Sequence, residues 1–201
     1  MIRFIKNILD IKNLLGMQRV VPPTPPEPYP ANEIVLRTNG NTVTFTPVFT
    51  GSITVRYTYN GTNTEVTYGN VWSGQQMSSY SDYGTDFIII GNVTQIEVGA
   101  DVEFLSYGNT IDYLYLYVVD SPNLRILDLR NLVSISSYAI SYACNINTIY
   151  ANATTSEIKD FTVSAINGSP DGGVLWIDRT QTYAADVIAA AQAHNWTIYD
   201  L

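Results

Sequence analysis

The fold that we expect follows from one heptapeptide, Asn123-Leu124-Arg125-Ile126-Leu127-Asp128-Leu129. It begins with Asn and an apolar residue, and it ends with apolar residues at alternate positions. Alternate residues of a strand point to the same side, so Leu127 and Leu129 predict a strand with one buried face. A strand this short cannot bury that face alone, and it therefore needs neighbours that carry the same pattern.

The pattern recurs along the chain at uneven spacing. Close copies begin at Asn92, Asn145 and Asn195, and a looser copy begins at Thr110. A period near ~20 residues is typical of leucine-rich repeats, whose stacked coils place their strands in parallel over one core. The alternative interpretation is an antiparallel sheet in which the Asn residues form turns. We expect the stacked arrangement, with parallel strands near Ile96, Leu114, Leu127 and Ile149.

These copies resemble BspA-like leucine-rich repeats. The resemblance rests on residues 123–132 and 145–158, and on a closing run of residues 173–178, a helix and residues 195–198. It covers residues 92–201, and several Leu positions of the family carry Tyr, Ile or Val here. Proteins of this type occur on the surfaces of gut Bacteroidetes and in the virions of their phages, including crAss-like phages. The resemblance therefore implies a binding or structural role rather than catalysis.

The composition limits the classes of protein to which the chain can belong. Charged residues make up only 14% of the 201 residues and there are 15 Tyr, which favours β-structure. The net charge of -8 argues against a nucleic-acid-binding body. The single cysteine, Cys144, excludes a disulfide framework within the chain and a metal site built from several cysteines.

Residues 1–19 differ from the rest and predict an anchor or oligomerisation helix. They carry more basic than acidic residues, whereas the whole chain is acidic. Apolar residues at coiled-coil spacing form its seam: Phe4, Ile8, Ile11 and Leu15. Charged residues interrupt the apolar run, so a secretory signal peptide and a membrane span do not fit. A basic amphipathic helix lying on a membrane surface is the alternative.

The next two segments read as a linker and a small antiparallel β region. Residues 20–33 are rich in proline and predict an extended, semi-rigid spacer, with a disordered hinge or a peptide ligand as alternatives. Residues 34–91 contain alternating strands around the hairpin signals Asn39-Gly40 and Asn60-Gly61.

A helix from Tyr183 to about His194, which Thr182 could cap, precedes the last strand. The predicted fold is thus mainly β: an N-terminal helix, an antiparallel region, and over residues 92–201 a short leucine-rich-repeat-like solenoid with one C-terminal helix.

The sequence offers no catalytic constellation. His194 is the only histidine, and no nucleophile elbow, phosphate-binding loop or dinucleotide fingerprint is present. The acidic residues Asp82, Asp86, Asp101 and Glu103 could surround calcium, but their spacing matches no EF-hand loop. Asp112 and Asp128 could form a hydrolytic pair, although solvated strand charges explain them as well. We expect no enzymatic activity, no cofactor and no bound metal.

Alternating tyrosines are the best candidates for contact with a partner. Tyr113, Tyr115 and Tyr117 share one side of their predicted strand. A row of tyrosines suits a glycan or a protein surface because the ring is apolar and its tip is polar. An interface between copies of the chain is the alternative.

These observations together favour a virion structural protein. An anchor helix, a proline spacer and a β-rich head are the plan of a phage head fibre or capsid decoration protein. We expect a homotrimer that docks on a capsid or other virion protein through residues 1–19, contacts a host surface glycan, and binds neither nucleic acid nor a membrane. The alternatives are a bacterial cell-surface adhesin, against which the missing secretion signal counts, and a tail fibre or carbohydrate-binding module.

Overall fold

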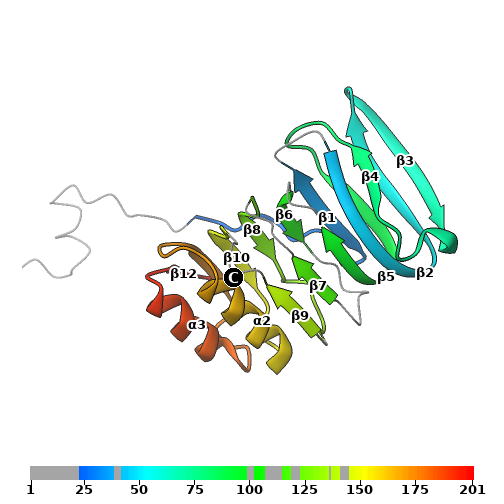
Figure 1. Ribbon diagram of the computed structural model, residues 1–201. Helices are drawn as coiled ribbons and strands as arrows, with labels where there is room; N and C mark the ends of the chain where they lie inside the picture. The colour runs from blue at the N-terminus through cyan, green and yellow to red at the C-terminus, as the bar shows by residue number, and fades with distance from the viewer. Residues whose placement is uncertain are drawn as a thin grey trace, which may run out of the picture.

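The computed structural model describes residues 23–38, 42–98, 102–106, 115–118, 123–135, 137–140 and 145–201, and at 115–118 and 137–140 it describes the backbone only. Strands dominate this part of the chain, and two α-helices lie near its C-terminal end (Figure 1). The strands are β1 (Glu33–Thr38), β2 (Thr42–Tyr59), β3 (Thr62–Gly69), β4 (Met77–Tyr80), β5 (Phe87–Val98), β6 (Val102–Ser106), β7 (Tyr115–Val118), β8 (Ile126–Asp128), β9 (Ser137–Ile140), β10 (Thr148–Ala151), β11 (Val174–Ile177) and β12 (Thr197–Asp200). The helices are the 3-10 helix η1 (Asn70–Trp72) and the α-helices α2 (Ser156–Asn167) and α3 (Ala184–Ala193).

The strands described form one open, mixed sheet. Along its main path their order is β12-β11-β10-β8-β6-β1-β5-β2-β3. Neighbours from β6 to β12 are parallel. By contrast, β1 is antiparallel to both β5 and β6, and β2 is antiparallel to β3, β4 and β5. β1 therefore joins an antiparallel part and a parallel part within one sheet.

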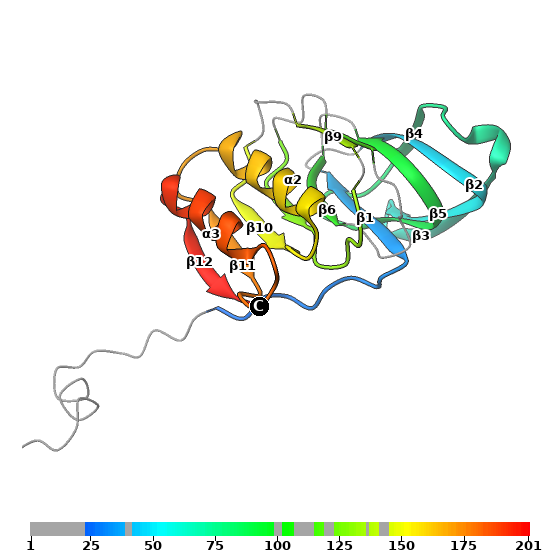
Figure 2. The same ribbon diagram turned by 90° about the horizontal axis from the view of Figure 1, so that it is seen from below.

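The long strand β5 changes its partner halfway along. Before Gly91, its residue Ile89 pairs with Ile34 of β1, whereas after Gly91 its residue Ile96 pairs in parallel with β7. Gly91 has a φ of 144°, a conformation that side chains other than glycine rarely adopt. β7 in turn pairs with β9. Figure 2 shows β9, α2 and α3 on one side of the molecule and β1, β6, β10, β11 and β12 on the other.

The core lies between these two layers. One row of apolar side chains crosses four parallel strands in register, and each member is at most 1% exposed: Leu105, Leu127, Ile149 and Leu175. From the facing layer, α2 contributes Phe161 to the same buried cluster and α3 contributes Val187. Burying each such side chain stabilises the fold by about 1.5–3 kcal/mol before the entropy of ordering it is subtracted.

The predicted short solenoid is wrong, because the repeat copies do not stack in one series. The copies that begin at Asn123 and Asn145 supply β8 and β10, whereas the copy that begins at Asn92 lies in β5. In the sheet, β1 and β6 stand between β5 and β8. The predicted parallel pairing of Leu127 with Ile149 is confirmed. An alternating pattern determines which side of a strand is buried but not which strand becomes its neighbour, so the pattern could not reveal the inserted β1.

Three smaller predictions about elements also need correction. The turn predicted at Asn39-Gly40 lies outside the described residues, and the described strands β1 and β2 are not neighbours, because β5 lies between them in the sheet. The single C-terminal helix is one of two, since α2 follows β10 and its first turn is capped by the Thr155 side chain, which accepts a hydrogen bond from the Ile158 amide at 3.3 Å. At α3, Tyr183 occupies the capping position in place of Thr182. The helix predicted over residues 1–19, with its seam of Phe4, Ile8, Ile11 and Leu15, lies outside the described residues.

Candidate functional site: a tyrosine tip and its pocket

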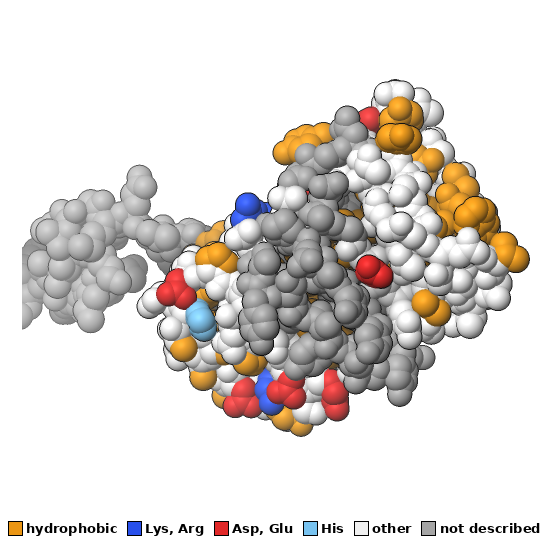
Figure 3. Space-filling model, in the orientation of Figure 1, with side chains coloured by type: hydrophobic (Ala, Val, Ile, Leu, Met, Phe, Trp, Pro, Cys, Tyr) orange, Lys and Arg blue, Asp and Glu red, His pale blue; other side chains and the backbone are white. Residues whose placement is uncertain are grey.

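The exposed apolar side chains lie mostly in the antiparallel part, at the two ends of the β2–β3 arm. Among the described residues, five of the seven large hydrophobic side chains that are exposed fall within residues 59–83: Tyr59, Val71, Trp72, Tyr80 and Tyr83. Figure 3 shows hydrophobic side chains gathered over the part of the molecule where Figure 1 draws β3 and η1. Exposed aromatic groups on a rigid sheet are typical of surfaces that contact a partner.

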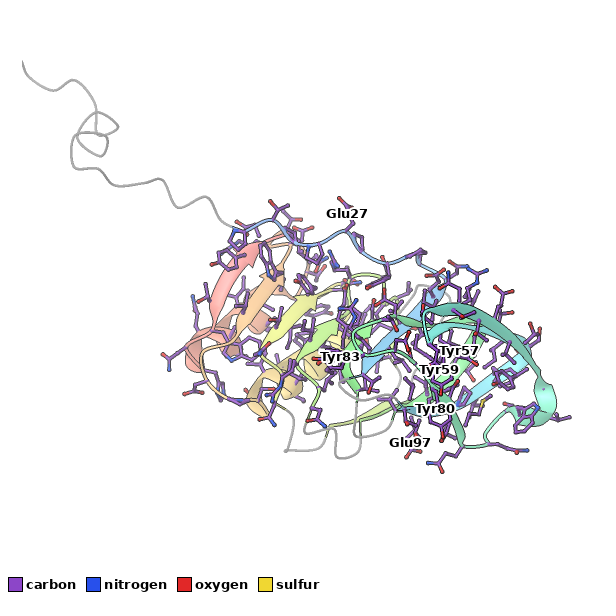
Figure 4. All side chains as sticks on the ribbon, turned by 90° about the horizontal axis from the view of Figure 1, so that it is seen from above. Glu27, Tyr57, Tyr59, Tyr80, Tyr83 and Glu97 are labelled. Atoms are coloured by element: carbon purple, nitrogen blue, oxygen red, sulfur yellow. The ribbon has the colours of Figure 1, made fainter. Side chains whose placement is uncertain are left out.

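Three of these exposed side chains, Tyr59, Tyr80 and Tyr83, we call the tyrosine tip; Tyr59 directly precedes the turn between β2 and β3. Asn60 and Gly61 both have positive φ, as a two-residue hairpin turn requires, so the hairpin predicted at Asn60-Gly61 is confirmed. The Asp82 carboxylate accepts hydrogen bonds from the backbone amides of Asn60 at 2.9 Å and Gly61 at 2.8 Å. The rings of Tyr59 and Tyr80 lie 5.5 Å apart between centroids. Asp82 thus fixes the turn that follows Tyr59, and Figure 4 labels Tyr59 close to Tyr80.

A surface pocket of about 350 Å³ is lined in part by Thr58, the residue that precedes Tyr59, but by none of the three tip tyrosines. The pairing of β2 with β5 ends at Arg56 and Ile88, so that β2 separates from β5 beyond this point. Eight residues around this separation line the pocket: Arg56, Tyr57, Thr58, Asn63, Thr64, Glu65, Asp86 and Ile88. The Tyr57 ring stacks on Phe87, with centroids 5.5 Å apart and planes inclined by 21°, which gives the pocket one firm wall.

Most polar groups of the pocket are weakly held. Arg56 Nε lies 2.7 Å from Glu65 Oε2, but about half of each side chain is exposed. An ion pair so exposed contributes at most about 1 kcal/mol to stability. Thr58 donates a hydrogen bond to the Asn63 side-chain oxygen at 3.0 Å, also at the surface. A guanidinium, a carboxylate, an amide and a hydroxyl can therefore turn toward a ligand at low cost.

Asp86 is the exception, because it belongs to a tightly bonded group. Its Oδ2 accepts a hydrogen bond from the Tyr29 hydroxyl at 2.9 Å, and its Oδ1 accepts one from Arg37 Nε at 3.0 Å. Arg37 also donates to the Tyr29 oxygen at 2.9 Å and lies over the Phe104 ring. Burial raises the pKa of Tyr29 to about 12, and the hydrogen bond that its hydroxyl donates to Asp86 adds to this effect. Asp86 is thus a fixed acceptor in the pocket wall.

A second row of aromatic side chains lies on the face of the sheet opposite the helices. Tyr150, Trp176 and Tyr199 stand in register on β10, β11 and β12, and their successive ring centroids are 6.2 and 4.7 Å apart. Arg130 lies over the Tyr150 ring. Tyr150 and Trp176 are no more than 9% exposed, so this row is covered and offers less contact surface than the tyrosine tip.

The residues predicted to carry function fall in several places. Tyr113 lies outside the described residues, and Tyr115 and Tyr117 lie on β7, where the structure describes only the backbone. Asp82 caps a turn and Asp86 binds Arg37, while Asp128 is paired with Arg130. Asp101 and Asp112 lie outside the described part. Across the described residues, no three His, Cys, Asp or Glu side chains cluster as metal ligands would.

Sequence reasoning missed Tyr59, Tyr80, Tyr83 and Tyr29. A usable signal existed for Tyr59, because it directly precedes the Asn60-Gly61 turn and so had to lie near the end of an arm. No comparable signal pointed to Tyr80, since its proximity to Tyr59 depends on how β4 pairs with β2.

Searches against protein-family models, curated proteins and solved structures found no match to this chain. In the part of the chain that the structure describes, no helix is both long and apolar enough to span a membrane. The arrangement of side chains therefore has to carry the functional argument.

Proposed function

We propose that this protein is a non-enzymatic attachment protein that binds carbohydrate at the tyrosine tip and the adjacent pocket. Two observations carry the proposal: the exposed Tyr59–Tyr80 pair, and a pocket with several polar groups whose lining includes Thr58, the residue before Tyr59. Sugars present apolar C–H faces and hydroxyl edges. Aromatic rings match the faces, and carboxylate, guanidinium and amide groups match the edges. A pocket of about 350 Å³ has the volume of a small-molecule site.

The polar side chains suit binding better than bond cleavage. The two carboxylates of the pocket, Glu65 and Asp86, are each paired with a guanidinium, from Arg56 and Arg37 respectively. A carboxylate that already accepts from a guanidinium still has acceptor positions for the hydroxyl groups of a ligand. His194, the only histidine, contacts Asp171 at 2.9 Å near the end of α3 rather than the pocket.

For its biological setting we propose the surface of a phage virion, with the protein as a head fibre or capsid decoration protein. The basic, apolar segment that precedes the proline-rich linker supports this setting. In this scheme residues 1–19 dock on a virion protein, three chains associate, and the tyrosine tip faces outward. Three copies would strengthen a weak carbohydrate contact through avidity.

Calorimetric titration against a panel of oligosaccharides tests the binding function. The panel contains maltohexaose, cellohexaose, mannohexaose and an alginate hexasaccharide, which covers neutral and acidic sugars. Substitution of Tyr59 or Tyr80 by Ala is expected to weaken binding about tenfold, equivalent to ~1.4 kcal/mol. Trp72→Ala is the matched control, because Trp72 is 44% exposed against 41% for Tyr59 but lies at the opposite end of the β2–β3 arm. The oligosaccharide should be recovered uncleaved.

Two outcomes would contradict this function. Equal losses in the Trp72 and Tyr59 variants would indicate unspecific apolar contact, and a panel without any binder would remove the carbohydrate assignment. The virion setting is tested separately. Mass spectrometry of purified particles should detect the chain. Light scattering of the purified protein should give the mass of three chains. A protein that lacks residues 1–19 should no longer be incorporated into particles. Detection on bacterial cells instead of particles would favour a surface adhesin.

A further inference from the structure

The described part of the proline-rich segment lies against the body instead of standing away from it. We call residues 23–30 the proline strap. The Pro26 carbonyl accepts a hydrogen bond from Arg130 Nη1 at 2.6 Å, and the Tyr29 carbonyl accepts one from the Asn131 amide at 2.6 Å. In Figure 2 the strap runs along the side of the sheet opposite α2 and α3 and passes the end of β12. Extended proline segments dock in this manner because their backbone is already ordered.

One residue of the strap reaches the pocket wall. The Tyr29 ring packs on Phe104 with centroids 5.5 Å apart, and its hydroxyl donates to Asp86 Oδ2. Asp86 lines the pocket of the proposed carbohydrate site. The strap and the pocket therefore share one carboxylate, which no other side chain of the strap contacts among the hydrogen bonds described.

We propose that the proline strap and the pocket are coupled through Asp86, so that a bound ligand tightens the strap and a docked strap strengthens ligand binding. The inference rests on the proposed function of the pocket. As a consequence, ligand binding in the pocket would affect how the strap holds residues 1–22, which precede it. An attachment protein would in this way report contact with its target to the end of the chain that holds it.

The sign of the coupling follows from counting hydrogen bonds at the carboxylate. The two oxygens of Asp86 offer about four acceptor positions. Arg37 occupies two of them and the Tyr29 hydroxyl a third. A sugar hydroxyl can take the remaining position without displacing Tyr29, and it then finds a carboxylate that is already oriented. Coupling between two sites is reciprocal, so the ligand must in turn stabilise the docked strap.

The first part of the test needs no sugar and uses the full chain. A nitroxide label is attached at Glu27→Cys in a Cys144→Ser background, because Glu27 is exposed and points away from the body in Figure 4. Its spectrum should show restricted motion when the strap is docked. Tyr29→Phe removes the hydroxyl but keeps the ring, and Asp86→Asn removes the charge of the acceptor. Both should mobilise the label, whereas the control Tyr199→Phe should not. A label that stays restricted in both variants overturns the coupling.

The second part measures the coupling with the panel sugar that binds the wild-type chain most tightly. Tyr29→Phe should weaken its binding about fivefold. Asn131→Ala should also weaken it, because this change loosens the strap from a position outside the pocket lining. Unchanged or tighter binding in either variant overturns the coupling. If no sugar binds, the proposed function fails, and the label measurements still decide whether Asp86 holds the strap.

Discussion

Asp128 and Arg130 form an ion pair in which losing one partner should cost more than losing both. Their side chains are only 3% and 11% exposed. Asp128 Oδ1 accepts from the backbone amide of Arg130 at 3.1 Å and from its Nε at 2.9 Å, and Oδ2 accepts from Nη2 at 2.6 Å. A single substitution therefore leaves one buried charge without its partner, and this unpaired charge accounts for most of the loss in stability.

The magnitude follows from what each variant leaves behind. Arg130→Met leaves the Asp128 carboxylate without a counter-ion, for an expected loss of about 3–5 kcal/mol. Asp128→Asn should cost ~3 kcal/mol, the lower end of that range, because Arg130 keeps the Pro26 carbonyl at 2.6 Å and the Tyr150 ring. The double variant Asp128→Leu, Arg130→Met removes both charges and should cost roughly 1–2 kcal/mol, because the backbone amide of Arg130 loses its acceptor on Asp128.

Urea unfolding followed by circular dichroism measures these free energies. A loss of 3 kcal/mol should also lower the thermal midpoint by roughly 6–12 °C in a chain of this size. Arg179→Met is the control, because its ion pair with Asp200 is more than half exposed and should contribute no more than about 1 kcal/mol. Single losses below 1 kcal/mol, or a double variant that costs the sum of the singles, would refute the reasoning.

Three further predictions address the bend, the tip and the strap. Gly91→Ala should destabilise the chain by about 2–4 kcal/mol, because Gly91 has positive φ and a Cβ there would lie 2.9 Å from the Ser52 carbonyl oxygen. Gly172 also has positive φ but faces open space, so the control Gly172→Ala should cost about 1 kcal/mol in the same urea assay. Asp82→Ala removes two hydrogen bonds from the β2–β3 turn, so amide exchange at Gly61 should quicken about tenfold, as for a loss of ~1.4 kcal/mol, and an unchanged rate would show that Asp82 does not hold the tip. Because the pKa of Tyr29 is raised to about 12, its contribution to strap docking should be complete below pH 10 and lost between pH 10 and 12; the Glu27→Cys label should follow that transition, and the Tyr29→Phe variant should lack it.

The sequence was informative about several local features. The alternation around Leu127 and Leu129 correctly indicated a buried face, and the pairing of Leu127 with Ile149 is parallel as predicted. The Asn60-Gly61 signal correctly marked a tight hairpin, because few residue pairs tolerate positive φ at both positions. These features depend on a residue and its near neighbours, which the linear pattern contains.

The candidate site could not be predicted in the same way. Tyr29, Arg37 and Asp86 are separated by up to 57 residues in the chain, yet they form one hydrogen-bonded group. The pocket exists because β2 separates from β5 beyond Arg56, which is a property of the ladder and not of either strand. The tyrosines chosen from the sequence, Tyr113, Tyr115 and Tyr117, were selected for their regular spacing, which indicates a strand but not its exposure.

The sequence by itself therefore indicated the strands around Leu127 and Ile149, their buried faces and the tight turn at Asn60-Gly61, since these depend on side-chain alternation and backbone preference over a few residues. Only the tertiary structure decided that β1 is inserted between β5 and β6, that the proline strap lies on the body, and that Asp86 serves both strap and pocket. The physical reason is that many strand pairings bury similar apolar area. The choice among them is made by the packing of the whole chain, and no heptapeptide carries that information.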